Sequence, residues 1–174
     1  RQNLSNLGFP GTMMTDCADL IRCTNLNQPV ARIDFTSKPV EILGKIVGSS
    51  DLLAQMADRH YLEKLVLLFK EFEEAGIPEF DSEVALLKKT EGFYKNVARK
   101  RLLAEMDNVS AHMVHHFRVR WGVDRDLYQE SIKNNLAFLV RIFEQIEDDA
   151  PDRQAYRQYL NRGDILKNAD GEGE

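Results

Sequence analysis

The stretch LGKIVGSSDLLAQMADRHYLEK, residues 43–64, decides the predicted fold. Its apolar residues nearly surround a helix, and smaller or polar residues interrupt them at helical spacing along one face. That polar stripe consists of Gly44, Gly48, Asp51, Gln55 and Asp58. The apolar positions expected to be buried around it are Leu43, Ile46, Val47, Leu52, Leu53 and Met56. We predict a central helix over residues 39–74, with a bend near His60 as the alternative.

The glycines and the aspartate of the stripe are expected to reduce the stability of a helix at these positions. A glycine inside a helix costs roughly 1 kcal/mol relative to alanine, so Gly44 and Gly48 predict close approach of another backbone or of a ligand. An unpaired buried carboxylate is very costly, so we expect a largely buried Asp51 to lie beside a cation. A metal ion and an arginine of a neighbouring helix both satisfy this requirement.

Further helices are predicted along the rest of the chain. The first helix is expected to bury Met14, Ala18, Leu20 and Ile21 on its inner side. Ser37 and Pro39 are typical of a helix start, as are Asp81 or Ser82 further on, and Gly122 is typical of a helix end. The predicted ranges are 11–24, 83–106, 108–120 and 125–147, with one or two helical turns in 152–162.

The segment LGKIVGSSDLLAQMADRHYLEKL resembles the last conserved segment of HD-domain proteins, the metal-dependent phosphohydrolase superfamily. LIRCTNLNQPVARIDFTSKPVEIL is similar to the helix and loop that precede this segment in one bacterial branch. FDSEVALLKKTEGFY and HFRVRWGVDRDLY, within residues 80–147, look like the C-terminal extension of that branch. The resemblance implies an all-α fold, a helical bundle of the HD-domain type with a C-terminal helical extension. Residues 1–78 would be the C-terminal part of the HD-like domain, 79–162 the extension packed on it, and 163–174 a disordered acidic tail.

The resemblance also implies a function, the hydrolysis of a nucleotide or another phosphate ester with a divalent metal ion. Asp51 matches the final aspartate ligand of the family. Lys45, Gln55 and Asp58 are expected to orient ligands or contact the substrate, although a solvated Lys45 is the more ordinary interpretation. The family's adjacent His-Asp pair does not occur in this sequence, and all four histidines follow Asp51. We therefore expect the C-terminal part of a longer protein, with a short homologue lacking the catalytic half as the other interpretation.

A second metal site is suggested by the motif HMVHH, which spaces His112, His115 and His116 by one helical turn. Such spacing is typical of two arms of a zinc or iron site, whereas solvated histidines are the more ordinary interpretation. The alternative function is a non-catalytic helical module for binding, regulation or oligomerisation. A homodimer is one expected form of such a module.

Composition limits the classes of partner. With 43% hydrophobic and 29% charged residues, the chain is typical of a folded globular domain. The net charge of −5 argues against general nucleic-acid binding, and the apolar runs are too short for a membrane span. Cys17 and Cys23 are expected to point to different sides of one helix and not to pair, which fits a cytoplasmic protein.

Overall fold

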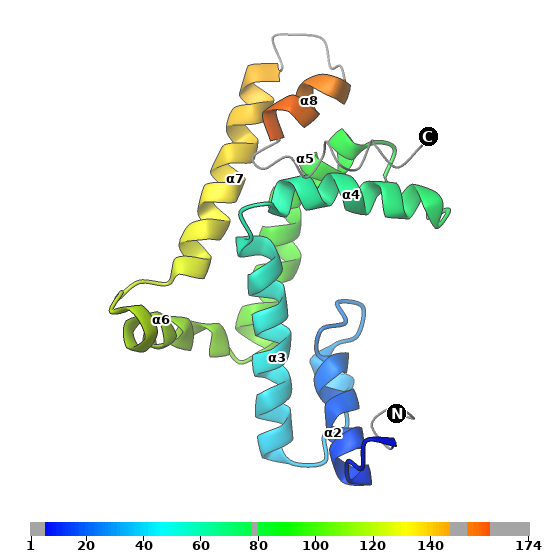
Figure 1. Cartoon of the computed structure of the whole chain (residues 1–174), viewed down its shortest axis with the longest axis vertical. Helices are drawn as coiled ribbons and strands as arrows, with labels where there is room; N and C mark the ends of the chain where they lie inside the picture. The colour runs from blue at the N-terminus through cyan, green and yellow to red at the C-terminus, as the bar shows by residue number, and fades with distance from the viewer. Residues whose placement is uncertain (1–5, 78–79, 147–152, 161–174) are drawn as a thin grey trace. The chain divides into compact units, whose positions relative to one another are not determined.

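In the computed structural model, residues 6–77, 80–146 and 153–160 are described. Every regular element among them is helical, which confirms the all-α prediction (Figure 1). No helix in these ranges is both long enough and apolar enough to cross a membrane. The α-helices are α2 (Gly11–Arg22), α3 (Lys38–Ala57), α4 (Tyr61–Glu74), α5 (Glu83–Phe93), α6 (Met113–Trp121), α7 (Leu127–Ile146) and α8 (Arg153–Leu160). Short 3-10 helices are η1 (Val30–Arg32) and η4 (Val109–His112), and the π-helical segments are η2 (Tyr94–Ala98) and η3 (Arg101–Glu105).

The chain divides into two compact units, each built from two separate stretches of sequence. The first unit combines the residues up to Ala54 with Lys95–Asp126. The second combines Gln55–Tyr94 with the residues from Leu127 onward. The predicted division at residue 78 stays a prediction, and the predicted acidic tail, 163–174, lies outside the described residues.

In the second unit, α4, α5, α7 and α8 all contact one another. Between α5 and α8, the Arg157 guanidinium donates to the carboxylate of Glu83. On α7, the buried Asn135 Nδ2 donates to the carbonyls of Met56 and Asp58 at 2.9 and 2.8 Å. These hydrogen bonds supply donors to carbonyls at the end of α3, where the helix itself provides none. The apolar core of this unit consists of Leu62, Leu65, Val66, Phe69, Leu86, Leu87, Leu139, Ile142, Tyr156 and Leu160.

The predicted bend near His60 is present as a break between α3 and α4. Asp58 stabilises this break, because its Oδ1 accepts the His60 backbone N–H at 2.8 Å and its Oδ2 pairs with Lys64. The hydrogen bond from Lys64, followed by that from His60, lowers the pKa of Asp58. A long helix over residues 39–74 is therefore replaced by two shorter ones.

Other helix ends follow the predicted signals. Ser82, rather than Asp81, caps α5, and its Oγ accepts the Ala85 N–H at 3.1 Å. At the start of α3, Ser37 Oγ accepts the Val40 N–H at 3.4 Å. Gly122 ends α6 in the left-handed conformation, with φ of +66°. These ends are set by local chemistry, which the sequence displays directly.

In the first unit, α2 and α3 lie side by side, and the contact is made at the two glycines (Figure 1). A Cβ on Gly44 would lie 2.8 Å from Cys23 Sγ, and one on Gly48 would lie 2.6 Å from the Cys23 carbonyl oxygen. The predicted close approach is confirmed, and its partner is the backbone at the end of α2. Cys23 is buried with Val30, Ile33 and Met106. Both cysteines are free, as predicted.

The prediction of which apolar residues are buried was wrong on part of α3. Leu52, Leu53 and Met56 are buried as expected, but Leu43, Ile46 and Val47 are 51, 39 and 37% exposed. The glycine face packs against α2 because it allows the closest backbone approach, and this turns the aliphatic residues outward.

On α2 the predicted inner side was wrong at one position. Ile21 is 67% exposed, whereas Asp19, two residues earlier, is buried. Its carboxylate is paired with Arg22, whose Nη1 lies 2.8 Å from Oδ1.

Gly48→Ala is expected to lower the free energy of unfolding by about 1–3 kcal/mol, because the new methyl group meets a backbone carbonyl that is held in place. The measurement is urea denaturation followed by circular dichroism. Gly11→Ala is the matched control, since nothing lies within 4 Å of a Cβ at that helical position. Equal stability of the two variants would contradict the close contact at Gly48.

Candidate functional site

Asp51 lies in the middle of α3, where it is partly buried, so the expected burial is met in part. Its neighbours Leu52 and Leu53 are buried, and Gln55, one turn further, is exposed. Asp58 lies beyond the end of α3, where its carboxylate holds the connection to α4. Among the described residues, no group of three or more His, Cys, Asp or Glu side chains is arranged to hold a metal ion.

Lys45 is buried and ion-paired, which corrects the ordinary interpretation of a solvated lysine. Its Nζ donates to Glu41 Oε1 and Asp107 Oδ2, both at 2.6 Å. Burial alone would lower the pKa of Lys45, but the hydrogen bonds to Asp107 and Glu41 outweigh it and raise that pKa. The hydrogen bonds from Lys45 and then Lys38 lower the pKa of Glu41. Lys38, Glu41, Lys45 and Asp107 thus form a row of alternating charges.

Beside this row lies a cavity of about 650 Å³, within the first unit. Its size is in the range of small-molecule sites. One wall is largely apolar and comes from the loop before α3, whereas the opposite wall carries the charged row. The lining residues are Val30, Ala31, Ile33, Phe35, Ser37, Lys38, Glu41, Lys45, Ala104, Glu105 and Asp107. The sequence analysis did not identify this cavity, because Ala104, Glu105 and Asp107 are far along the chain from the other lining residues, which all lie within 30–45.

Asp107 reaches the cavity from a strained turn. Asp107 and Asn108 have φ of +50° and +54°, in the left-handed region that non-glycine residues rarely adopt. The Asn108 N–H donates to the Leu102 carbonyl at 3.0 Å, and the Val109 N–H to the Met106 carbonyl at 3.1 Å, which holds the turn. Strained residues of this kind cluster at ligand-binding positions. No glycine in the sequence signals this turn.

Arg101 fixes the loop that forms the apolar wall. Its Nη2 donates to the carbonyls of Cys23, Asn25 and Gln28 at 3.1, 2.9 and 3.1 Å. Its Nη1 donates to Glu105 Oε2 at 3.2 Å, and the same oxygen accepts the Val30 N–H at 3.0 Å. Arg101 is therefore buried with its charge paired and its donors used by the loop backbone.

Arg101 and Glu105 lie in the π-helical segment η3, inside the range predicted as one regular helix over residues 83–106. The Met106 N–H donates to the Arg101 carbonyl at 3.0 Å, five residues back. Such π-helical turns are frequent at functional sites and have no simple sequence signal.

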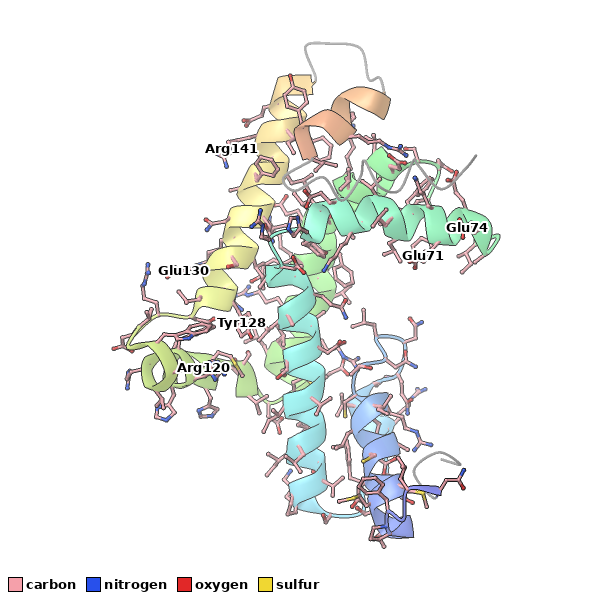
Figure 2. All side chains as sticks on the ribbon, viewed as in Figure 1. Glu71, Glu74, Arg120, Tyr128, Glu130 and Arg141 are labelled. Atoms are coloured by element: carbon pink, nitrogen blue, oxygen red, sulfur yellow. The ribbon has the colours of Figure 1, made fainter. Side chains whose placement is uncertain are left out.

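The three histidines of the HMVHH motif are all exposed. His112 ends η4, whereas His115 and His116 lie on α6. They line a surface hollow of about 580 Å³ with Val119 and Arg120, and Figure 2 labels Arg120 on α6. The metal site suggested for these histidines stays a prediction.

Comparison with known proteins identifies no family, since no family model, no curated protein and no solved structure matches the chain. The resemblance to HD-domain proteins consequently stays a prediction.

Arg101→Met is expected to lower the free energy of unfolding by about 3–5 kcal/mol, because it leaves Glu105 and three loop carbonyls without their donor. The measurement is chemical denaturation. Arg99→Met, an exposed position two residues earlier, is the control and is expected to change stability by less than about 0.5 kcal/mol. A small loss for Arg101→Met would show that the loop does not depend on the guanidinium.

Proposed function

We propose that this chain is part of a metal-dependent phosphohydrolase of the HD type, in which Asp51 supplies one oxygen ligand to a divalent metal ion. The observation that carries the proposal is the position of Asp51. It lies within an uninterrupted helix of 20 residues, beside buried leucines, and is itself partly buried. A rigid helix position and partial desolvation suit a metal ligand, and the resemblance of residues 43–65 points to the same residue.

The remaining ligands, a histidine and a His-Asp pair, would come from residues outside this sequence. The bound metal would act as a Lewis acid on a phosphoryl oxygen. Gln55 is exposed one turn from Asp51 and would contact substrate or a ligand. Asp58 would have a structural role, because Lys64 and the His60 backbone already use both of its oxygens. Lys45 would also be structural, since Glu41 and Asp107 hold it.

The test uses the protein expressed with the coding sequence that precedes Arg1, which is expected to encode a histidine and then an adjacent His-Asp pair. Asp51→Asn is expected to abolish metal-dependent hydrolysis of phosphate esters and to weaken metal binding by about tenfold or more, since a neutral amide is a poorer ligand than a carboxylate. Calorimetric metal titration and a phosphate-release assay measure these effects. Asp34→Asn, in an exposed loop position, is the control.

Thermal melts in chelator distinguish a metal ligand from a structural carboxylate. If Asp51 is a metal ligand, the Asp51→Asn variant is expected to melt at the same temperature as the parent protein or higher, because functional residues often reduce stability. A large loss of melting temperature with unchanged metal affinity would instead assign Asp51 to a structural ion pair. Metal-dependent turnover by the 174 residues alone would also contradict the proposal.

A second function, that of an oligomerisation module, is favoured by the aliphatic face of α3. This face consists of Ile42, Leu43, Ile46 and Val47, which are all exposed and recur at helical spacing. An exposed apolar patch of this kind commonly marks an interaction site. We propose a second copy of the chain as its occupant, because a twofold axis beside α3 would cover the same four side chains in both copies.

Leu43→Lys is expected to weaken self-association by about tenfold or more, because it places a charge in the apolar contact. Sedimentation velocity over a concentration series measures the change. Val119→Lys alters an exposed valine on α6 and is expected to leave the association constant unchanged. A parent protein that stays monomeric at every concentration would rule out the homodimer.

A further inference from the structure

The cavity beside Lys45 has a ligand-binding composition that involves neither Asp51 nor the aliphatic face of α3. We propose that it binds an organic cation, a primary ammonium group carried on an aromatic or aliphatic body. This inference rests on the cavity alone and holds whether or not the chain belongs to a phosphohydrolase.

The charged wall presents two carboxylates that would accept from a ligand, those of Glu105 and Asp107. Asp107 uses Oδ2 for Lys45, and its side chain is 61% exposed. Glu105 uses Oε2 for Arg101 and Val30. Within the described residues, no hydrogen bond is recorded to Asp107 Oδ1 or Glu105 Oε1. An ammonium group has three donors and no acceptor, so it matches these two oxygens.

An anionic ligand fits the same wall poorly. It would place its charge near the carboxylates of Glu41, Glu105 and Asp107, which all line the cavity. Two of the three N–H donors of Lys45 Nζ already donate to the carboxylates of Glu41 and Asp107. The exposed Lys38 donates to Glu41 Oε2 at 2.9 Å. The lining residues carry three carboxylates and two ammonium groups, and this excess of negative charge favours a cation over an anion.

The opposite wall accounts for the apolar body of the ligand. Val30, Ile33 and Phe35 line it, together with the small side chains of Ala31 and Ala104. Ligand sites typically combine such an apolar surface with a few fixed polar groups. Phe35 is the aromatic residue among them, and aromatic rings attract cations.

Both walls are held in place before any ligand arrives. Arg101 binds the carbonyls of the loop that leads to Val30, and the left-handed turn fixes Asp107 opposite Lys45. Preorganised acceptors reduce the entropy lost on binding. The site therefore does not depend on a conformational change in the first unit.

The test is calorimetric titration of the full chain with three probes: phenethylamine, hydrocinnamate and methylammonium. Hydrocinnamate has the same aromatic group with the opposite charge, and methylammonium has the charge without the apolar body. Phenethylamine is expected to bind at least about tenfold more tightly than either, because only it uses both walls. No binding of phenethylamine up to about 10 mM, or equal or tighter binding of hydrocinnamate, would overturn the proposal.

Two variants locate the binding. Asp107→Asn is expected to weaken the binding of phenethylamine by about tenfold or more, because it removes a charged acceptor. Asp34→Asn, in the neighbouring loop, is the control and is expected to leave the affinity unchanged. Ala104→Leu fills the cavity from an exposed position without removing a core side chain, and it is expected to abolish binding. Thermal melts confirm that each variant is folded. Binding that survives Ala104→Leu would place the amine elsewhere and refute the site.

Discussion

The guanidinium of Arg101 is the interaction on which the first unit depends. The chain leaving α2 has carbonyls that no helix satisfies, and the Arg101 side chain donates to three of them, at Cys23, Asn25 and Gln28. A planar guanidinium suits this purpose because it carries five donors in a fixed geometry. The Cys23 carbonyl oxygen also lies where a Cβ on Gly48 would meet it, at 2.6 Å. One buried cation therefore fixes the loop, the end of α2 and the contact between α2 and α3.

The same interaction connects the fold to the cavity. Glu105 neutralises Arg101 and also accepts the N–H of Val30, the first residue of the apolar wall. Glu105 lies in the π-helical segment that leads to the strained turn at Asp107. The left-handed turn thus places Asp107 on the charged wall, and long-range hydrogen bonds from Arg101 to the loop carbonyls place the apolar wall. Neither would form a cavity without the other.

The elements could be predicted from the sequence far better than their contacts. The helix ends at Ser82 and Gly122 follow from a cap and a glycine that act within a few residues, and the break near His60 is stabilised locally by Asp58. The partner of Lys45 could not be predicted, because Asp107 is 62 residues away and reaches it through an unsignalled turn. Helical periodicity also could not decide which face of α3 is buried. The glycines predicted a close contact, and the aliphatic residues were wrongly expected to be buried as well.

The outward orientation of the aliphatic residues changes how Asp51 is understood. Leu43, Val47 and Asp51 follow one another at steps of four, so Asp51 ends a row that begins on the aliphatic face. A surface that covers Leu43 and Val47 would come close to Asp51 and remove more water from its carboxylate. A second copy of the chain along this face, as proposed above, would therefore change the surroundings of Asp51 as well.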